Sequence, residues 1–160
     1  TYMFLHGDFS HLFFNMFALW MFGRGLEWEM GTRRFLVYYF VCGIGAALIQ
    51  LLMMQIDLAG LPPHSLDYYH YLWTPTLGAS GAVFGLLLAF GMLHPNATIM
   101  LLIPPIPMKA KWFVVIYGLL ELFLGMSGSM DNVAHFAHLG GMFWGWLLLM
   151  WWHYKARRRF

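Results

Sequence analysis

The sequence predicts an all-α polytopic membrane protein that crosses the bilayer five times. Three observations lead to this prediction: the composition, the long apolar segments and the placement of the basic residues. Apolar residues make up 61% of the 160 residues and charged residues 10%, against roughly 45–50% and about 25% in soluble domains. A soluble fold of this size would leave much of that apolar surface in contact with water. We therefore expect a lipid bilayer as a partner, and no nucleic acid.

Five apolar segments have the character of membrane-spanning helices, which need about 20 residues and tolerate roughly 17–25. The predicted spans cover residues 11–22 (or 9–22), 35–54, 77–94, 112–126 and 133–152. The first span is short, so we expect it to start in a polar region lined by protein. Residues 96–110 either extend the third span or fold back as a loop, because Pro104, Pro105 and Pro107 forbid a continuous helix there. The loop 56–75 is the main predicted extramembrane segment.

The basic residues all fall on one side of this five-span arrangement. They follow the first, third and fifth spans: Arg24, Arg33, Arg34, Lys109, Lys111, Lys155, Arg157, Arg158 and Arg159. The opposite side receives Asp8, Asp57, Asp67 and Asp131. By the positive-inside rule the basic side is cytoplasmic, which puts the C-terminus inside and the N-terminus outside. We therefore expect a multi-pass protein of a bacterial plasma membrane, in which residues 1–160 form one membrane domain that lacks a preceding sixth helix.

Four polar residues lie inside the predicted spans at a common depth. His11 and Asn15 occur in the outer part of the first span, Ser80 near the outer end of the third, and His138 a few residues into the fifth. Polar groups within a bilayer are costly and usually mark function. Residues that serve only helix packing have no reason to agree in depth. The sequence therefore predicts one site, built from three helices, toward the outer side of the membrane.

Ser80 lies in a run of small residues, Gly-Ala-Ser-Gly at 78–81, that favours close helix packing. Gly81 and Gly85 have the small-xxx-small spacing of tightly packed membrane helices. The fifth span carries a matching face: Ala137, Gly141 and Gly145. Packing of these two faces would bring Ser80 within hydrogen-bonding distance of His138. Taken alone, Ser80 is also compatible with a helix N-cap or an interhelical hydrogen bond.

The pairing of Ser80 with His138 predicts nucleophilic catalysis. A serine hydroxyl is a poor nucleophile until a base takes its proton, and an imidazole titrates near neutrality. The fifth span contains no carboxylate, so we expect a dyad rather than a triad; contact with Glu121 in the fourth span stays open. Phe84 follows Ser80 by four residues on the same helix face, where it either packs against the imidazole or serves as an ordinary core aromatic.

His11 and Asn15 are candidates for stabilising an oxyanion. Their i, i+4 spacing puts both on one helix face, at the depth of the predicted nucleophile. Acyl transfer needs hydrogen-bond donors aimed at the developing negative charge, and an imidazole N–H, an amide and the Ser80 backbone N–H would supply them. Either residue alone is equally compatible with a structural role at the start of a helix.

The remaining histidines and the single cysteine give weaker signals. His135 precedes His138 by three residues and shares its helix face, and His6 lies in the outer loop; for both, structural hydrogen bonding is the favoured interpretation. Four others resemble loop or boundary residues: His64, His70, His94 and His153. Cys42 lies in an apolar run and predicts packing, not a disulfide or a cysteine zinc site.

Three motifs in this order resemble the signatures of the rhomboid intramembrane serine proteases. They are His-x-x-x-Asn at 11–15, Gly-Ala-Ser-Gly at 78–81 and Ala-His-Leu-Gly-Gly at 137–141. The run Gly-Arg-Gly-Leu-Glu at 23–27, followed by Gly31, resembles the loop after the second span of that family. The likeness extends from Thr1 to about Trp152. Each motif is short, but their order and separation are specific.

The resemblance implies a rhomboid-like bundle of six helices, of which the second, fourth and sixth carry the site. Ser80 and His138 would be the catalytic dyad, His11 and Asn15 the oxyanion donors, and Gly78, Gly81, Phe84 and Gly141 supporting residues. The implied reaction is hydrolysis of transmembrane protein substrates in or near the bilayer, without metal or cofactor. The family favours small residues at the scissile bond and substrate helices that unwind readily.

Two other functions compete with this interpretation. A transporter or metal-dependent hydrolase would use His6, His11, His135 and His138 as ligands, but it leaves Ser80 and Asn15 without a role. A non-catalytic rhomboid relative that escorts membrane proteins would usually have lost the serine or the histidine. The loop 126–133, rich in Gly and Ser, is expected to act as a lid above the site.

Overall fold

The computed structural model describes residues 2–73, 75–101, 105–126 and 132–157. Each of the five predicted spans forms a helix. The elements are a 3₁₀ turn Tyr2–Phe4, α1 Phe9–Ala18, a π-helical turn Leu19–Gly23, α2 Arg24–Met30, α3 Thr32–Gly60, α4 Leu66–Trp73, α5 Ser80–Leu93, β1 Thr98–Met100, β2 Pro107–Lys109, α6 Ala110–Met126 and α7 Asn132–Arg157.

The centre of the bundle is formed by α3, α5 and α7, and α6 packs against both α5 and α7. The largest side chains that are almost completely buried are Leu26 of α2, Tyr38 and Cys42 of α3, and Leu86 of α5. Cys42 therefore has the packing position that the sequence predicts. The Tyr38 hydroxyl donates a hydrogen bond to the Gly85 carbonyl oxygen at 2.8 Å and so ties α3 to α5.

Glycines allow α5 and α7 to approach almost backbone to backbone. A Cβ atom built on Gly141 would lie 1.8 Å from the carbonyl oxygen of Gly81, and one built on Gly85 would lie 3.2 Å from the carbonyl oxygen of Gly141. Real Cβ atoms do not approach backbone atoms that closely, so any larger residue at 141 would push the helices apart. The predicted small faces thus meet at Gly81, Gly85, Ala137 and Gly141, whereas Gly145 packs against Tyr38 and Cys42 of α3.

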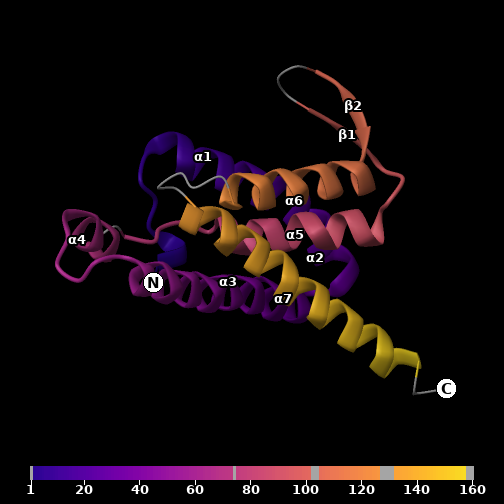
Figure 1. The fold of residues 1–160 in the computed structure, drawn as a ribbon. Helices are drawn as coiled ribbons and strands as arrows, with labels where there is room; N and C mark the ends of the chain where they lie inside the picture. Colours follow the sequence, from indigo (N-terminus) through magenta and orange to yellow (C-terminus); the bar gives the residue numbers. More distant parts are fainter. Residues whose placement is uncertain (1, 74, 102–104, 127–131, 158–160) are drawn as a thin grey trace.

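The helices alternate in direction along the bundle (Figure 1). Helices α1, α5 and α7 start at the end near α4, and α3 and α6 run back toward it. As a result, α2, the start of α3, the β1–β2 hairpin and the end of α7 lie toward the opposite end. These elements, together with the start of α6 at Lys111, carry the described basic residues. The segregation of charge inferred from the sequence is therefore a property of the folded chain.

Large apolar side chains are exposed on the outside of the bundle, where lipid would cover them. On α6 they include Trp112, Leu119 and Phe123. Among the described residues one helix, α3, is by itself long and apolar enough to cross a membrane, and α5 is apolar but shorter, with 14 residues. Helix α7 has 26 residues but is less apolar.

Several boundaries differ from the predicted ones. The first span continues through the π-helical turn into α2, so the predicted loop after it is helical up to Gly31, whose φ of +79° ends the helix. Thr98–Met100 and Pro107–Lys109 form an antiparallel pair of strands, in which Ile99 pairs with Met108, because the prolines stop the chain from continuing as a helix. Loop 56–75 is partly helical, since α3 extends to Gly60 and α4 follows. The lid predicted at 126–133 falls largely on residues 127–131, outside the described residues.

Candidate active site

Ser80, at the start of α5, meets His138 in the second turn of α7. The Ser80 Oγ lies 2.8 Å from Nε2 of His138, although 58 residues separate them in sequence. Ser80 is the first residue of α5; the N-cap position belongs to Ala79, which makes no side-chain capping bond. Ser80 is therefore not an N-cap residue, and its hydroxyl faces the imidazole.

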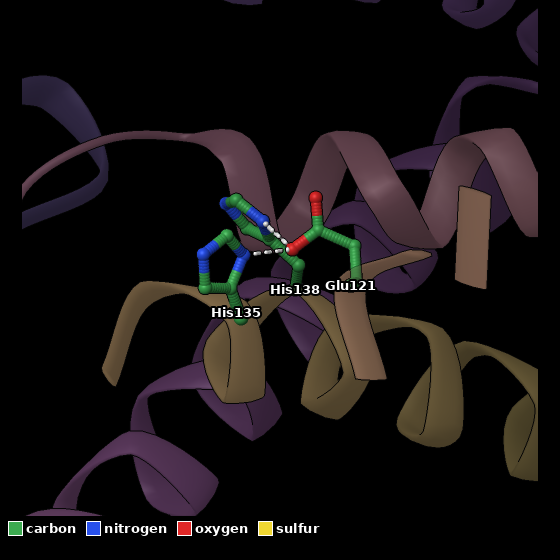
Figure 2. Close-up of side chains that lie close together, drawn as sticks. All are labelled: Glu121, His135 and His138. Atoms are coloured by element: carbon green, nitrogen blue, oxygen red, sulfur yellow. Dashed lines mark hydrogen bonds and ion pairs between the residues drawn. The ribbon is translucent and has the colours of Figure 1, made fainter. Parts of the chain in front are cut away.

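Glu121 on α6 completes a chain of three side chains with Ser80 and His138. Figure 2 shows its contact with His138, which the sequence left open. Its Oε2 lies 2.9 Å from Nδ1 of His138, and the residue is only 6% exposed. The expectation that His138 lacks an acidic partner was wrong. Because the ionised carboxylate only accepts hydrogen bonds, it selects the tautomer with a proton on Nδ1 and leaves the Nε2 lone pair free to accept the Ser80 proton.

His135 shares the same carboxylate oxygen. Its Nδ1 lies 2.7 Å from Oε2 of Glu121, so two imidazoles donate to a single oxygen atom. The i, i+3 spacing indicated that His135 and His138 share a helix face. It did not identify the acceptor, because Glu121 lies on another helix. The one available signal was a carboxylate within an apolar span, which in membrane proteins is itself a sign of function.

Phe84 holds the ring plane of His138. The two rings stack with centroids 4.2 Å apart and an angle of 5° between their planes. Tyr117 of α6 packs against Phe84 in turn, with ring centroids 5.7 Å apart. Stacking and the Glu121 hydrogen bond together restrict both the position and the rotation of the imidazole, so its Nε2 stays directed at Ser80.

His11 reaches the site from α1. A Cβ atom built on Gly78 would lie 2.6 Å from Nε2 of His11 and 3.7 Å from Oγ of Ser80. The His11 imidazole and the Ser80 hydroxyl therefore both lie next to Gly78. Gly78 has a φ of +114°, which L side chains rarely adopt. Only glycine satisfies both the backbone angle and the close approach of the imidazole.

Asn15 is used differently from His11. Its Nδ2 donates to the backbone carbonyl oxygen of His11 at 2.8 Å, and the residue is 5% exposed. It is not among the residues that line the cavity described below. The i, i+4 spacing thus produces a hydrogen bond along the helix, and one amide hydrogen of Asn15 remains for another acceptor.

A cavity of about 340 Å³ opens beside these groups. His11, Ser80 and His138 line it together with small residues: Ala46, Gly78, Gly81 and Ala137. Gln50, 4% exposed, donates to the Thr76 hydroxyl at 3.2 Å, but its Oε1 accepts no hydrogen bond from the described residues. The cavity is therefore lined by small residues beside the serine and carries one buried acceptor.

Tyr71 and His70 of α4 close another part of the cavity wall. The Tyr71 hydroxyl donates to the Asp57 carboxylate and ties α4 to the end of α3. Burial, reinforced by this carboxylate, raises the pKa of Tyr71, so the hydroxyl stays protonated and keeps its donor role. His70, predicted to be a loop residue, borders the cavity from a short helix.

The other histidines have separate surroundings. His6 packs its ring edge-on against His11, with centroids 5.2 Å apart, and its buried Nε2 finds no partner among the described residues. His94 pairs with Glu29 at 2.8 Å, and Nδ1 of His64 lies 2.8 Å from the Tyr69 hydroxyl. Within the described part of the chain, one group has ligand atoms close enough for a metal site: Glu121, His135 and His138. This group differs from the four histidines of the competing metal interpretation.

Comparison with known proteins identifies the family of the chain. The model of the Rhomboid domain matches residues 1–155. Rhomboid protein 1, mitochondrial, of Saccharomyces cerevisiae is 33% identical over 153 residues, which cover 96% of this chain and 40% of the yeast protein. Rhomboid protease AarA of Providencia stuartii is 29% identical, over 91% of this chain and 52% of its own length.

A third relative covers the whole chain. The putative rhomboid protease YdcA of Bacillus subtilis is 31% identical over 162 residues, which cover 100% of this chain and 69% of the relative. The chain spans about two fifths of the length of the mitochondrial yeast relative and of a plant relative. No solved structure matches this chain significantly. The family match confirms the predicted fold, a rhomboid-like helical bundle embedded in the membrane, and the chain belongs to the rhomboid family.

Proposed function

We propose that the protein is an intramembrane serine endopeptidase in which Ser80 is the nucleophile and His138 its general base. The observation that carries the proposal is the 2.8 Å contact between Oγ of Ser80 and Nε2 of His138, inside a membrane bundle. Relatives named as rhomboid proteases support the same reaction class. The substrates are transmembrane proteins, cleaved in or near the bilayer, and the active site faces the outer side with the C-terminus in the cytoplasm.

The reaction follows from the hydrogen bonds of the site. As Oγ attacks a peptide carbonyl carbon, the hydroxyl proton passes to Nε2 of His138 and the carbonyl electrons move to the oxygen. The Glu121 carboxylate stabilises the resulting imidazolium through Nδ1–H. The imidazolium then protonates the leaving amine, and a water molecule deprotonated by His138 hydrolyses the acyl-enzyme. Glu121 thus extends the proposed pair into a Ser–His–Glu relay.

Three donors are proposed for the oxyanion. Ser80 is the first residue of α5, and the N–H groups of a first helical turn have no intrahelical acceptor. His11 borders Gly78 beside the serine, and Asn15 has one amide hydrogen that is not used by the His11 carbonyl. Together they would stabilise the charge that develops as the substrate carbonyl becomes tetrahedral.

The cavity indicates which peptide segment fits. Its glycine and alanine lining leaves room for a backbone with small side chains at the scissile bond. A peptide must expose its carbonyl to reach Ser80, so the substrate helix has to unwind locally. The unpaired Oε1 of Gln50 would accept an N–H that such unwinding releases.

A fluorophosphonate probe tests the proposal on the full-length protein in detergent or liposomes. Wild type should be labelled and should cleave a model transmembrane substrate, whereas Ser80→Ala and His138→Ala should do neither. His153→Ala is the matched control, since His153 is an exposed histidine on the same helix. A folded wild type that is neither labelled nor proteolytic would refute the protease assignment and favour an escort function.

A further inference from the structure

The cluster of Glu121, His135 and His138 has more ligating groups than the proposed reaction needs. His138 uses Nε2 toward Ser80 and Nδ1 toward Glu121. His135 contributes nothing to that relay, yet its Nδ1 is directed at the same carboxylate oxygen. The two imidazole nitrogens and the carboxylate oxygen all lie within 4.8 Å of one another.

This arrangement is close to that of a three-ligand metal site. Zinc binds imidazole nitrogen and carboxylate oxygen at about 2.0–2.2 Å, which places the ligand atoms of a tetrahedral site about 3.3 Å apart. The two contacts to Oε2 are 2.7 and 2.9 Å. A tetrahedral site would require these two contacts to lengthen by roughly half an ångström. The two Nδ1 atoms, which lie within 4.8 Å of each other, would have to stand about 3.3 Å apart.

The burial of these three side chains favours a bound cation. Glu121 has a side-chain exposure of 9%, and those of His135 and His138 are 19% and 17%. A carboxylate at this depth is poorly hydrated and gains from a nearby positive charge. Two histidines and one glutamate are a ligand set that zinc accepts, with a fourth position left for water.

We propose that Glu121, His135 and His138 bind a divalent cation of the zinc class, and that the bound ion switches off Ser80. The ion would take the lone pair of Nδ1 of His138, so the neutral imidazole would carry its proton on Nε2. In that tautomer Nε2 is a donor and cannot accept the Ser80 proton. The inhibitory effect rests on the proposed protease function, whereas the metal binding does not.

Binding is measured directly with Zn²⁺ on the full-length protein in detergent, by competition against a chromophoric chelator after EDTA treatment. Wild type should bind one ion. His135→Gln and His135→Phe should each weaken that affinity at least about tenfold, since even second-shell changes at metal sites cost 10–100-fold. His153→Gln on the same helix should bind like wild type. Equal affinity in wild type and both His135 variants would overturn the proposal.

Inhibition is measured by fluorophosphonate labelling in EDTA and in Zn²⁺. Wild type should be labelled in EDTA and lose labelling as Zn²⁺ fills the site, whereas the His135 variants should stay labelled at the same Zn²⁺ concentration. Their labelling in EDTA also shows that they fold. Equal inhibition of wild type and variants would place the effect elsewhere and refute the switch. Zn²⁺ binding that depends on His135, without labelling of wild type in EDTA, would uphold the metal site and reject the protease function.

Discussion

The two sides of the candidate site are built in different ways. On the side of α5, α6 and α7, side chains from three helices contact one another directly: Ser80, Glu121 and His138. On the α1 side, Asn15 donates to the carbonyl of its own helix, and α1 packs mainly on the π-helical turn that continues it, with slight contact to α5. The proposed nucleophile and base are thus held by the core, whereas two of the three proposed oxyanion donors, His11 and Asn15, lie on a peripheral helix.

This difference separates two requirements of catalysis. Proton transfer needs hydrogen-bond geometry from the start, so it belongs on the helices whose glycines allow the closest packing. Oxyanion donors act on a group that arrives with the substrate, and their bonds tighten only in the transition state. A loosely packed α1 is therefore compatible with substrate entry on that side.

The largest effect is expected from a substitution that forces α5 and α7 apart, because these helices hold Ser80 and His138 together. Gly141→Leu places a Cβ atom 1.8 Å from the Gly81 carbonyl oxygen, so α5 and α7 must separate and Ser80 must lose His138. We expect loss of fluorophosphonate labelling and a thermal unfolding temperature lowered by several degrees, since overpacking costs about 1–3 kcal/mol or more. Gly25→Leu, in open space on α2, is the control. Normal labelling of Gly141→Leu would show that the close approach is not required.

On the α1 side, His11→Ala should reduce kcat about 10²–10³-fold, the usual cost of one oxyanion donor. KM should change little, because the charge exists only in the transition state. Asn15→Ala should have a smaller effect, since part of its hydrogen bonding serves the helix. Steady-state cleavage of a model substrate measures both. Equal losses of kcat in His11→Ala and Asn15→Ala would show that the different contacts of the two residues do not matter for catalysis.

The acidic partner of His138 is tested by Glu121→Gln. The amide oxygen still accepts the Nδ1 hydrogen bond but does not stabilise an imidazolium. We therefore expect kcat to fall about a hundredfold, at the lower end of the 10²–10⁴-fold range of general acid–base contributions. Glu121→Asp should recover part of the rate, and KM should stay near its wild-type value. Pre-steady-state acylation measures the effect. An unchanged acylation rate in Glu121→Gln would restore the simple dyad.

The smallest effect is expected at the aromatic support. Phe84→Leu removes a ring stacked 4.2 Å from His138, and such pairs contribute about 0.5–1.5 kcal/mol, so acylation should slow about two- to tenfold. Phe84→Tyr keeps the ring and should stay close to wild type. Labelling time courses distinguish the two variants. A Phe84→Leu protein as fast as wild type would assign the ring to packing alone.

Much of the fold was predictable because a bilayer constrains the chain strongly. Apolar segments of defined length and basic residues on alternate connections determined the order and direction of the helices, as α3 and α7 illustrate. The hairpin at 98–109 was harder to predict, since the prolines exclude a helix without specifying what replaces it. The helical continuation into α2 was missed because Gly23 and Gly25 suggested a loop, although tertiary packing tolerates glycine in a helix.

The sequence by itself determined that Ser80 and His138 share a depth and lie on helix faces lined by small residues. Those properties are local and periodic, and periodicity can be read along a single helix. Only the tertiary structure decided which way α6 is rotated and therefore what Glu121 contacts. The carboxylate lies 17 residues from His138 and on another helix, and its pairing depends on how side chains from three helices fill one buried volume.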